Sequence, residues 1–217
     1  MEQIVSGVGV LDKSLSILGV LEQDPCGLAE LTVRTGLPRA TAHRLAVALE
    51  QHGMVRRDVR GDFCLGPRLL GLAQAAQAAL PLAELAGPIL EELRAATSES
   101  VQLFVREGDV RVCIRSLDSL HELRTIVRPG ARLPLGIGSA GRILAGEQTK
   151  TGWIATVAER ASGVASVSAA VLGADGVSIA AVSVSGPIER LGRTPGKAHG
   201  AAVVFAAQEL GLRIRQV

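Results

Sequence analysis

The stretch Leu28–His52, LAELTVRTGLPRATAHRLAVALEQH, decides the first part of the fold. It predicts a short helix over 28–34 and a second helix that opens at Pro38 and runs to His52, with Thr35-Gly36 between them. A glycine suits the left-handed residue that ends many helices. A proline is favoured in a first helical turn because its missing N–H costs nothing there. Two short helices joined by such a turn are typical of a helix-turn-helix, which binds DNA in some proteins and is plain packing in others.

The segments on either side extend this motif. Apolar residues recur at helical spacing from Val10 to Leu21, and Asp24-Pro25-Cys26-Gly27 ends that predicted helix. After the motif, residues 54–58 and 62–65 alternate in polarity around Arg60-Gly61, which indicates a β-hairpin. Three helices followed by a hairpin predict a winged helix-turn-helix over residues 1–66.

The helix that opens at Pro38 has one face for a core and another for a partner. Ala42, Leu45, Ala46 and Leu49 share one side of it, and its N-terminal turn is the part that meets base edges in this architecture. Residues 34–60 contain six arginines against two acidic residues, whereas the whole chain carries a net charge of only +2. Positive charge is therefore concentrated where DNA would lie. The candidate DNA-binding residues are Arg39, Thr41, His43, Arg44, Arg56, Arg57 and Arg60.

Composition limits the function further. Hydrophobic residues make up 47% of the chain, enough for a sizeable core, whereas aromatic residues make up 2%, which nearly excludes aromatic platforms for stacking bases. The N-terminus lacks a signal-peptide pattern, and no run of about 18 apolar residues occurs, so we expect a cytoplasmic protein. Cys26, Cys64 and Cys113 are widely spaced and form no CxxC pair. We expect reduced thiols rather than a zinc site or disulfides, with a redox-sensing thiol as the alternative.

Neither an enzyme nor a nucleotide-binding fold is indicated. None of the four histidines stands in a catalytic motif, and no pair of nucleophile and base can be named. Residues 136–141 match GxGxxG, but residues 128–134 before them make a poor strand, and a dinucleotide-binding motif needs a buried strand at that point. We expect no catalytic residue, no cofactor and no bound metal.

The rest of the chain predicts an α+β domain. Leucines and alanines form an apolar stripe that predicts a helix over 67–80, and a second helix follows over 82–96. Strands joined by short turns favour an antiparallel sheet with helices packed on it. The expected strands are 100–106, 109–116, 122–128, 164–172 and 177–185, followed by a last helix over about 196–210.

Two motifs resemble the IclR family of transcriptional regulators, GLPRATAHRL at 36–45 and FCLGPRL at 63–69. Further resemblance lies at 132–135, 163–164 and 181–187 (AVSVSGP), so that it covers nearly the whole chain. It implies a winged helix-turn-helix at 1–66, a linker helix at 67–81 and a GAF-like effector-binding domain with an antiparallel sheet at 82–217. The resemblance is closest to the actinobacterial clade associated with leucine and other amino-acid biosynthesis genes.

The resemblance also implies a pocket for a small effector in the C-terminal domain. Backbone N–H groups where a helix begins near Ser139 would hold a carboxylate, serines would offer donors, and Leu135 and Val164 would form apolar walls. An amino acid or a small organic acid fits such a site, although Ser183 and Ser185 are also consistent with strand residues that simply face outward. The matching positions are Leu135, Gly138, Ser139, Ala140, Val164, Ser166, Ser183 and Ser185.

Two stretches depart from the family pattern. Residues 156–160 hold one acid where the family often carries an acidic stretch, and the region 146–153 is shorter than usual. The family implies a homodimer or tetramer that binds a double-stranded DNA operator, with a ligand that changes DNA affinity. Whether it represses or activates is open, and a DNA-binding scaffold without an effector or a redox-sensing regulator are the alternatives.

Overall fold

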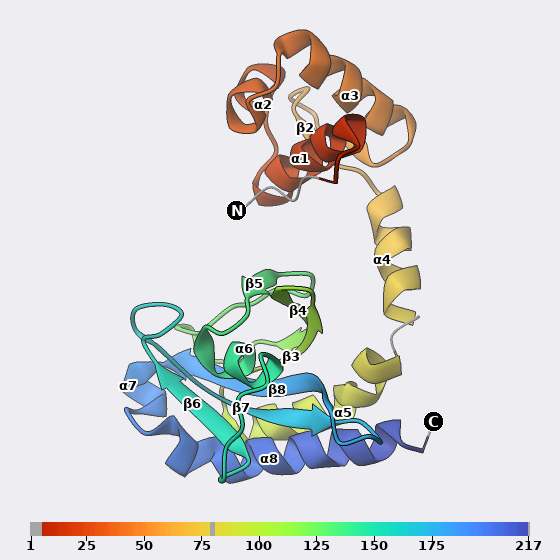
Figure 1. The fold of residues 1–217 in the computed structure, drawn as a ribbon. Coiled ribbons are helices and arrows are strands. Elements are labelled where there is room, and N and C mark those ends of the chain that lie inside the picture. The colour runs from red at the N-terminus through yellow and green to blue at the C-terminus, as the bar shows by residue number, and fades with distance from the viewer. Residues whose placement is uncertain (1–5, 79–80, 217) are drawn as a thin grey trace. The chain divides into compact units, whose positions relative to one another are not determined.

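The computed structural model describes residues 6–78 and 81–216. The chain divides into two compact units, Met1–Ala76 and Gln77–Val217 (Figure 1). Among the described residues no single helix is long and apolar enough to cross a membrane, and the bent pair Arg68–Ala76 and Pro81–Thr97 meets that test only when its two helices are counted together.

The N-terminal unit is a winged helix-turn-helix, as the sequence predicts. Its elements are the helices α1 (Gly9–Gln23), α2 (Leu28–Thr35) and α3 (Arg39–Gln51), the strands β1 (Val55–Arg57) and β2 (Phe63–Leu65), and the helix α4 (Arg68–Ala78). Gly36 ends α2 in the left-handed region at φ 67° and donates its N–H to the Thr32 carbonyl. This glycine turn allows α3 to start three residues later. The last residues of the helix expected over 67–80 lie outside the described residues.

One side of each helix forms the core of this unit. Ile17 from α1, Leu31 from α2 and Ala46 from α3 are fully buried and pack around Phe63 of β2. The backbone of Cys26 pairs with that of Phe63, so the hairpin is tied to the turn between α1 and α2. The three helices and the hairpin therefore share one hydrophobic cluster, which fixes the side of α3 that can face outward.

The C-terminal unit is an α+β domain built on one antiparallel sheet. The six strands lie in the order β5-β4-β3-β8-β7-β6, and all neighbours are antiparallel. The strands are β3 (Ser100–Glu107), β4 (Val110–Leu117), β5 (Arg132–Pro134), β6 (Trp153–Val157), β7 (Val164–Leu172) and β8 (Ser178–Pro187). The helices are α5 (Pro81–Thr97), α6 (Gly138–Leu144), α7 (Ile188–Leu191) and α8 (Pro195–Ile214).

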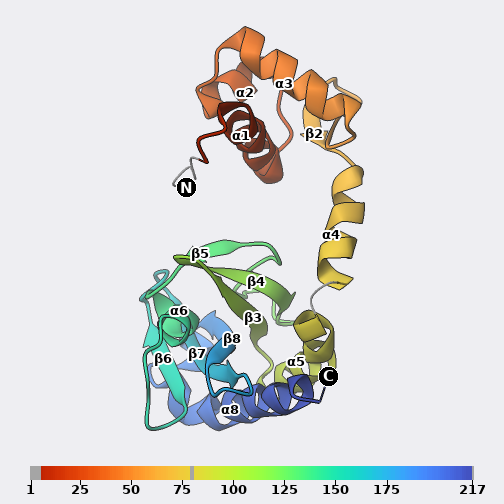
Figure 2. The same cartoon turned by 45° about the vertical axis from the view of Figure 1, so that its right-hand side comes forward.

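The two faces of this sheet differ because side chains alternate along each strand. On one face Val101, Val167 and Val184 are completely buried against α5 and α8. The other face lies against α6 and includes Gln102, Ser183 and Ser185. Figures 1 and 2 show α5 and α8 along one side of the sheet and α6 on the other. An apolar core and a polar concave face therefore share the same strands.

The strand expected over 122–128 is wrong. Thr125 and Val127 are buried and Ile126 is exposed, so the alternation in the sequence reports burial correctly. The segment nevertheless belongs to the loop between β4 and β5, because the edge of β4 is taken by β5 at residues 132–134, which the sequence analysis judged a poor strand. The short strand β6 was not expected. Alternation alone does not reveal whether a partner strand is available.

Gly196 and Gly200 leave a notch in α8 that the Trp153 ring of β6 fills. A Cβ at either glycine would overlap the indole ring. Four residues apart, the two glycines lie one above the other on the same side of the helix. Glycine normally weakens a helix interior, so these positions serve the contact between α8 and β6.

We predict that Gly200→Ala lowers the free energy of unfolding by about 1–3 kcal/mol, because the added methyl overpacks the indole. At an exposed helix position the same change stabilises, so the sign of the effect tests the contact. Urea denaturation followed by circular dichroism measures it. Ala201→Ser, at an exposed position one residue along, serves as control and is expected to stay within about 0.5 kcal/mol. A stabilised Gly200→Ala protein would contradict the packing described for Trp153.

Candidate functional site

The N-terminal turn of α3 presents an exposed basic surface. Arg39, His43 and Arg44 are exposed and Thr41 is half-buried, while Ala42 lies completely buried on the opposite side. Burial of the inward side is what turns the arginines outward, since the two sets of positions lie on opposite sides of the helix. The structure thus leaves the sequence-predicted residues of α3 accessible to a partner.

The three arginines of the hairpin are placed differently from one another. Arg57 lies over the Phe63 ring, 4.2 Å from its centroid, and its Nε is 3.6 Å from an oxygen of Glu50. Arg60 pairs with Asp58 and Asp62 at 3.5 and 3.8 Å. Arg56 is exposed, and the ion pairs found among the described residues do not include it. Surface pairs of this kind are worth little, so they can exchange for another anion.

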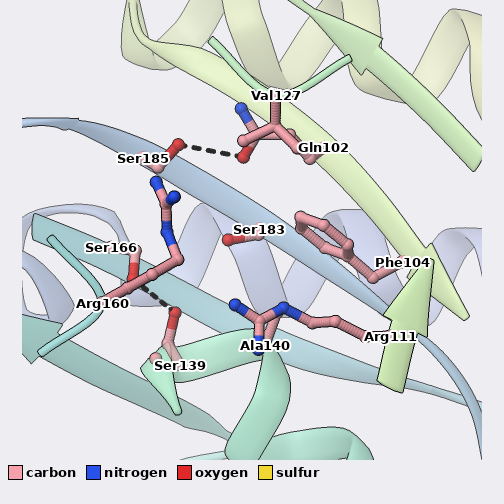
Figure 3. Close-up of a pocket in the computed structure, with 11 residues that line it drawn as sticks. Gln102, Phe104, Arg111, Val127, Ser139, Ala140, Arg160, Ser166, Ser183 and Ser185 are labelled. Carbon is pink, nitrogen blue, oxygen red and sulfur yellow. Dashed lines mark hydrogen bonds between the residues drawn. The ribbon is translucent and has the colours of Figure 1, made fainter. Parts of the chain in front are cut away.

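A small pocket lies under α6 on the polar face of the C-terminal sheet (Figure 3). Strand register explains how it forms, because Gln102 is opposite Ser183 and Ser166 is opposite Ser185 across three adjacent strands. The free volume is only ≈ 20 Å³, about the space of one water molecule. The lining residues are Gln102, Phe104, Arg111, Val127, Gly138, Ser139, Ala140, Arg160, Ser166, Ser183 and Ser185.

Hydroxyl groups along one wall of the pocket form a connected network. Ser139 Oγ lies 2.8 Å from Ser166 Oγ and 2.7 Å from Ser168 Oγ. Ser168 in turn donates to Ser183 at 2.9 Å, which completes this network. A separate bond joins Ser185, as donor, to Gln102 Oε1 at 3.0 Å. Each hydroxyl can both donate and accept a hydrogen bond. The hydroxyl protons can therefore turn toward an incoming polar group while the oxygen atoms stay in place.

The backbone amides at the start of α6 already have acceptors. Gly138 N–H donates to Glu159 at 3.0 Å and Ser139 N–H donates to Thr156 Oγ1 at 3.1 Å. The expectation that these amides would hold a ligand carboxylate is therefore corrected, because the Glu159 carboxylate and the Thr156 hydroxyl already accept from them. Glu159 is the one acid in the stretch 156–160.

Arg111 of β4 is a buried cation on the floor of this pocket, 3% exposed. Its Nη1 donates to the carbonyls of Pro134 and Ile137 at 2.5 and 2.6 Å. Residue 141 must be a glycine for the Arg111 side chain to lie here, because a Cβ at that position would overlap the Arg111 guanidinium. Burial, with repulsion from Arg160 as the second cause, lowers the pKa of Arg111 to about 10. The guanidinium therefore stays charged at neutral pH.

Two buried nitrogen donors at the pocket have no partner among the described residues. They are Nε of Arg111 and Nε2 of Gln102, whose side chain is 1% exposed. Buried polar groups are nearly always hydrogen-bonded, and each exception calls for an explanation. In a pocket, the explanation most consistent with the geometry is an acceptor that arrives from outside.

Six of the eight sequence-predicted effector residues line the pocket, and Leu135 and Val164 do not. Leu135 is half-buried against the cluster under α6, and Val164 is the first residue of β7, beyond the pocket end. The apolar walls are instead Phe104 and Val127. Phe104 shares a face of its strand with Gln102, so alternation offered a signal for both. Alternation at 122–128 indicated that Val127 is buried but not that it reaches the pocket, and Arg160 comes from a loop and gave no signal.

A larger hollow of ≈ 1000 Å³ runs along α8 on the far side of α6. Val204, Gly211 and Leu212 of α8 line one side, and residues 146–149 with Gly152 contribute another. The loop 146–152 belongs to the region that the sequence analysis found shorter than is usual in the IclR family. Among the described residues, the lining of this hollow includes no buried side-chain donor that lacks a partner.

Comparison with known proteins agrees with this architecture. A model of the IclR helix-turn-helix domain matches residues 10–59, and a model of the C-terminal domain of bacterial transcriptional regulator IclR matches residues 74–150. The HTH-type transcriptional regulator KipR of Bacillus subtilis is 31% identical over 131 residues, 60% of this chain and 52% of that protein. The regulator TtgV of Pseudomonas putida is 33% identical over 141 residues, 64% of this chain and 54% of that protein. The chain spans about half the length of the curated relatives it matches first.

Solved structures share the fold. An IclR homolog from Microbacterium hydrocarbonoxydans, complexed with 4-hydroxybenzoate, matches with a TM-score of 0.81 at 21% identity over 96% of this chain and 100% of that one. The IclR protein of Thermotoga maritima matches with a TM-score of 0.75 at 17% identity over 95% and 99%.

Fold and pocket together define a two-unit protein in which a winged helix-turn-helix precedes an α+β domain with a polar pocket. The two family matches span more than half of the sequence. This chain belongs to the IclR family of bacterial transcriptional regulators.

We predict that Cys113 resists alkylation in the folded protein. Burial raises the pKa of its thiol to about 12, so the reactive thiolate makes up about one part in ten thousand at pH 8. Iodoacetamide labelling at pH 8 followed by peptide mass spectrometry is expected to modify Cys113 only after denaturation. Rapid labelling of the native chain would contradict the burial and revive the redox-sensing alternative.

Proposed function

We propose that this chain is a DNA-binding transcriptional regulator whose affinity for its operator responds to a small organic acid. The observation that carries the proposal is the exposed basic turn of α3, with Arg39 and Arg44 free at its surface, in a chain that also holds a pocket with unpartnered buried donors.

The physical fit to DNA lies in α3 and the wing. The major groove admits one helix, and arginine can bind guanine through two hydrogen bonds. Arg44 and Arg39 are the proposed base-reading residues, with Thr41 and His43 beside them. Arg56, Arg57 and Arg60 would contact phosphate, and Arg57 and Arg60 would exchange their carboxylate partners for phosphate when they do so.

Dimerisation is part of the proposal. Two recognition helices would enter successive major grooves of a pseudo-palindrome about one helical turn apart. Leu70 and Leu72 of α4 are exposed, which favours a partner chain on that helix, as a dimer or within a tetramer. The proposed domains are residues 1–66, the linker 67–81 and residues 82–217. The boundary between the two compact units, after residue 76, falls within this linker in the sequence.

The charge around the pocket favours an organic acid over an amino acid. Both charged side chains that line the pocket are arginines. The acid beside it, Glu159, is already engaged by the Gly138 amide and by Arg142. The ammonium group of an amino acid would lie next to these cations without a carboxylate partner, whereas a carboxylate gains from them. The Microbacterium homolog was crystallised with 4-hydroxybenzoate, which is itself an organic acid. Control of amino-acid biosynthesis genes, suggested by the resemblance, remains a proposal about targets.

The proposal is tested by footprinting the full chain on the DNA upstream of its own gene, with and without a panel of organic acids. Specific protection that a member of the panel changes is the expected result. Protection that no acid alters would leave a DNA-binding scaffold, and no protection on any selected genomic fragment would overturn the regulator assignment.

We predict that Arg44→Ala weakens binding to the specific operator by about 1–3 kcal/mol, roughly 5- to 150-fold in Kd, because a bidentate contact to a base is lost. Fluorescence anisotropy with a labelled operator measures it. Arg193→Ala, an exposed arginine of the C-terminal unit, is the matched control and is expected to bind as the unmodified chain does. Equal affinity of the Arg44→Ala chain would remove this residue from the base-reading set.

We predict that Arg56→Ala weakens binding to all DNA sequences alike and reduces the slope of log K against log salt by about 1, because one phosphate contact is lost. Binding isotherms at several salt concentrations give the slope. Arg57→Ala is expected to act in the same direction but also to lower the stability of the hairpin, since Arg57 packs on Phe63. An unchanged slope in both variants would exclude the wing from the DNA contacts.

A further inference from the structure

We propose that the pocket under α6 recognises a small dicarboxylate, with one carboxylate at Arg111 and the other at Arg160. This inference rests on the proposed function, because it takes the pocket to be the effector site. It narrows the ligand from an organic acid in general to a molecule with two anionic ends.

The first anionic end is indicated by Arg111. A buried cation is costly unless it is paired, and the described residues give this guanidinium two backbone carbonyls but no carboxylate. The carbonyls occupy only Nη1, while Nε lacks a partner. Phe104 lies under the guanidinium, 5.4 Å from carbon Cζ to the ring centroid. A ligand carboxylate would supply the missing charge.

The second end is indicated by Arg160. It is an exposed residue in the loop between β6 and β7, and it lines the same pocket. Its charge is close enough to Arg111 to lower the pKa of that residue by repulsion. Two cations on one cavity repel each other, and an anion between them removes that cost. None of the ion pairs among the described residues includes Arg160.

The arrangement of the two arginines favours a molecule with separated charges over a single compact anion. Figure 3 shows Arg160 entering from one side with its guanidinium toward Ser185, while Arg111 enters from the other side and lies by Ala140. The side chains of Phe104 and Val127 are the apolar part of the lining. A pocket with a cationic group at each end and an apolar wall is complementary to a molecule with two carboxylates joined by a short hydrocarbon chain.

Binding requires a change at the pocket mouth. The free volume of ≈ 20 Å³ is too small for any dicarboxylate. Arg160 is the lining residue with the most freedom, since it is exposed and lies on a loop, whereas Gln102, Ser139 and Ser183 are held in hydrogen bonds on the sheet and α6. We therefore expect Arg160 to move outward as the ligand enters and to close on its second carboxylate.

The experiment is isothermal calorimetry of the full chain with malonate, succinate, glutarate and adipate, each compared with the monoamide of the same length. The monoamide keeps the shape and one charge and loses the other. Loss of one charge-assisted contact predicts binding about 10- to 100-fold weaker for the monoamide. Inorganic phosphate is included as the compact anion.

The variant that decides the assignment is Arg160→Gln. It is expected to bind the best dicarboxylate and its monoamide with nearly equal affinity, because the second contact is gone, while unliganded stability is retained or rises slightly, because the repulsion between Arg160 and Arg111 is relieved. Arg193→Gln is the matched control and is expected to keep the full preference. Arg111→Lys is expected to weaken both ligands, and its melting temperature without ligand is measured in parallel because Arg111 also holds two backbone carbonyls.

Three outcomes would overturn the proposal: equal affinity of the unmodified chain for dicarboxylate and monoamide, tighter binding of phosphate, or no binding of any member of the panel. Each of these leaves the proposed DNA-binding function intact if footprinting remains specific. Conversely, a chain that binds dicarboxylates with the expected preference but protects no DNA would retain this inference and lose the regulator assignment. The two failures are therefore distinguishable.

Discussion

Side-chain alternation along β3, β7 and β8 is the constraint on which the C-terminal unit depends. Each strand must present small apolar residues to α5 and α8 on one face and polar residues to α6 on the other. Shifting the register of one strand by a single residue would place Gln102 or Ser183 in the hydrophobic core and expose a valine. The same strand pairing therefore builds both the core and the polar wall of the pocket, and the geometry of that wall is as rigid as the sheet.

The two arginines of the pocket come from elements of different kinds, a strand and a loop. Arg111 is fixed within β4 by two carbonyls and by the space that Gly141 leaves, whereas Arg160 belongs to a loop. Glu159 accepts from the Gly138 amide and Thr156 from the Ser139 amide at the start of α6, so an incoming anion is directed toward the side chains instead. A ligand that bridges Arg111 and Arg160 would couple its binding to the position of the loop that carries Arg160. Such coupling of binding to conformation is required for any signal sent beyond the pocket.

Sequence reasoning located the elements with strong periodicity and failed where pairing or closure decides the outcome. The helices of the N-terminal unit and strands β3, β4, β7 and β8 follow from apolar spacing and turn residues. The alternation at 122–128 predicted correctly which residues are buried. Its prediction of a strand was wrong, because β5 occupies the edge of β4 with which such a strand would pair. In the pocket, serines on strands were found, whereas Arg160 and Val127 reach it from loops whose path depends on tertiary packing. Arg111 had a weak signal, as an arginine between valines in a strand.

The notch that Gly196 and Gly200 cut into α8 also has a spectroscopic consequence. Trp153, which fills it, is the single tryptophan of a chain that has no tyrosine. Intrinsic ultraviolet emission of this protein therefore originates in the C-terminal unit alone, at the contact between a sheet edge and the longest helix. The winged unit contains no tryptophan or tyrosine. Unfolding of the C-terminal unit can therefore be followed by tryptophan fluorescence without interference from the winged unit.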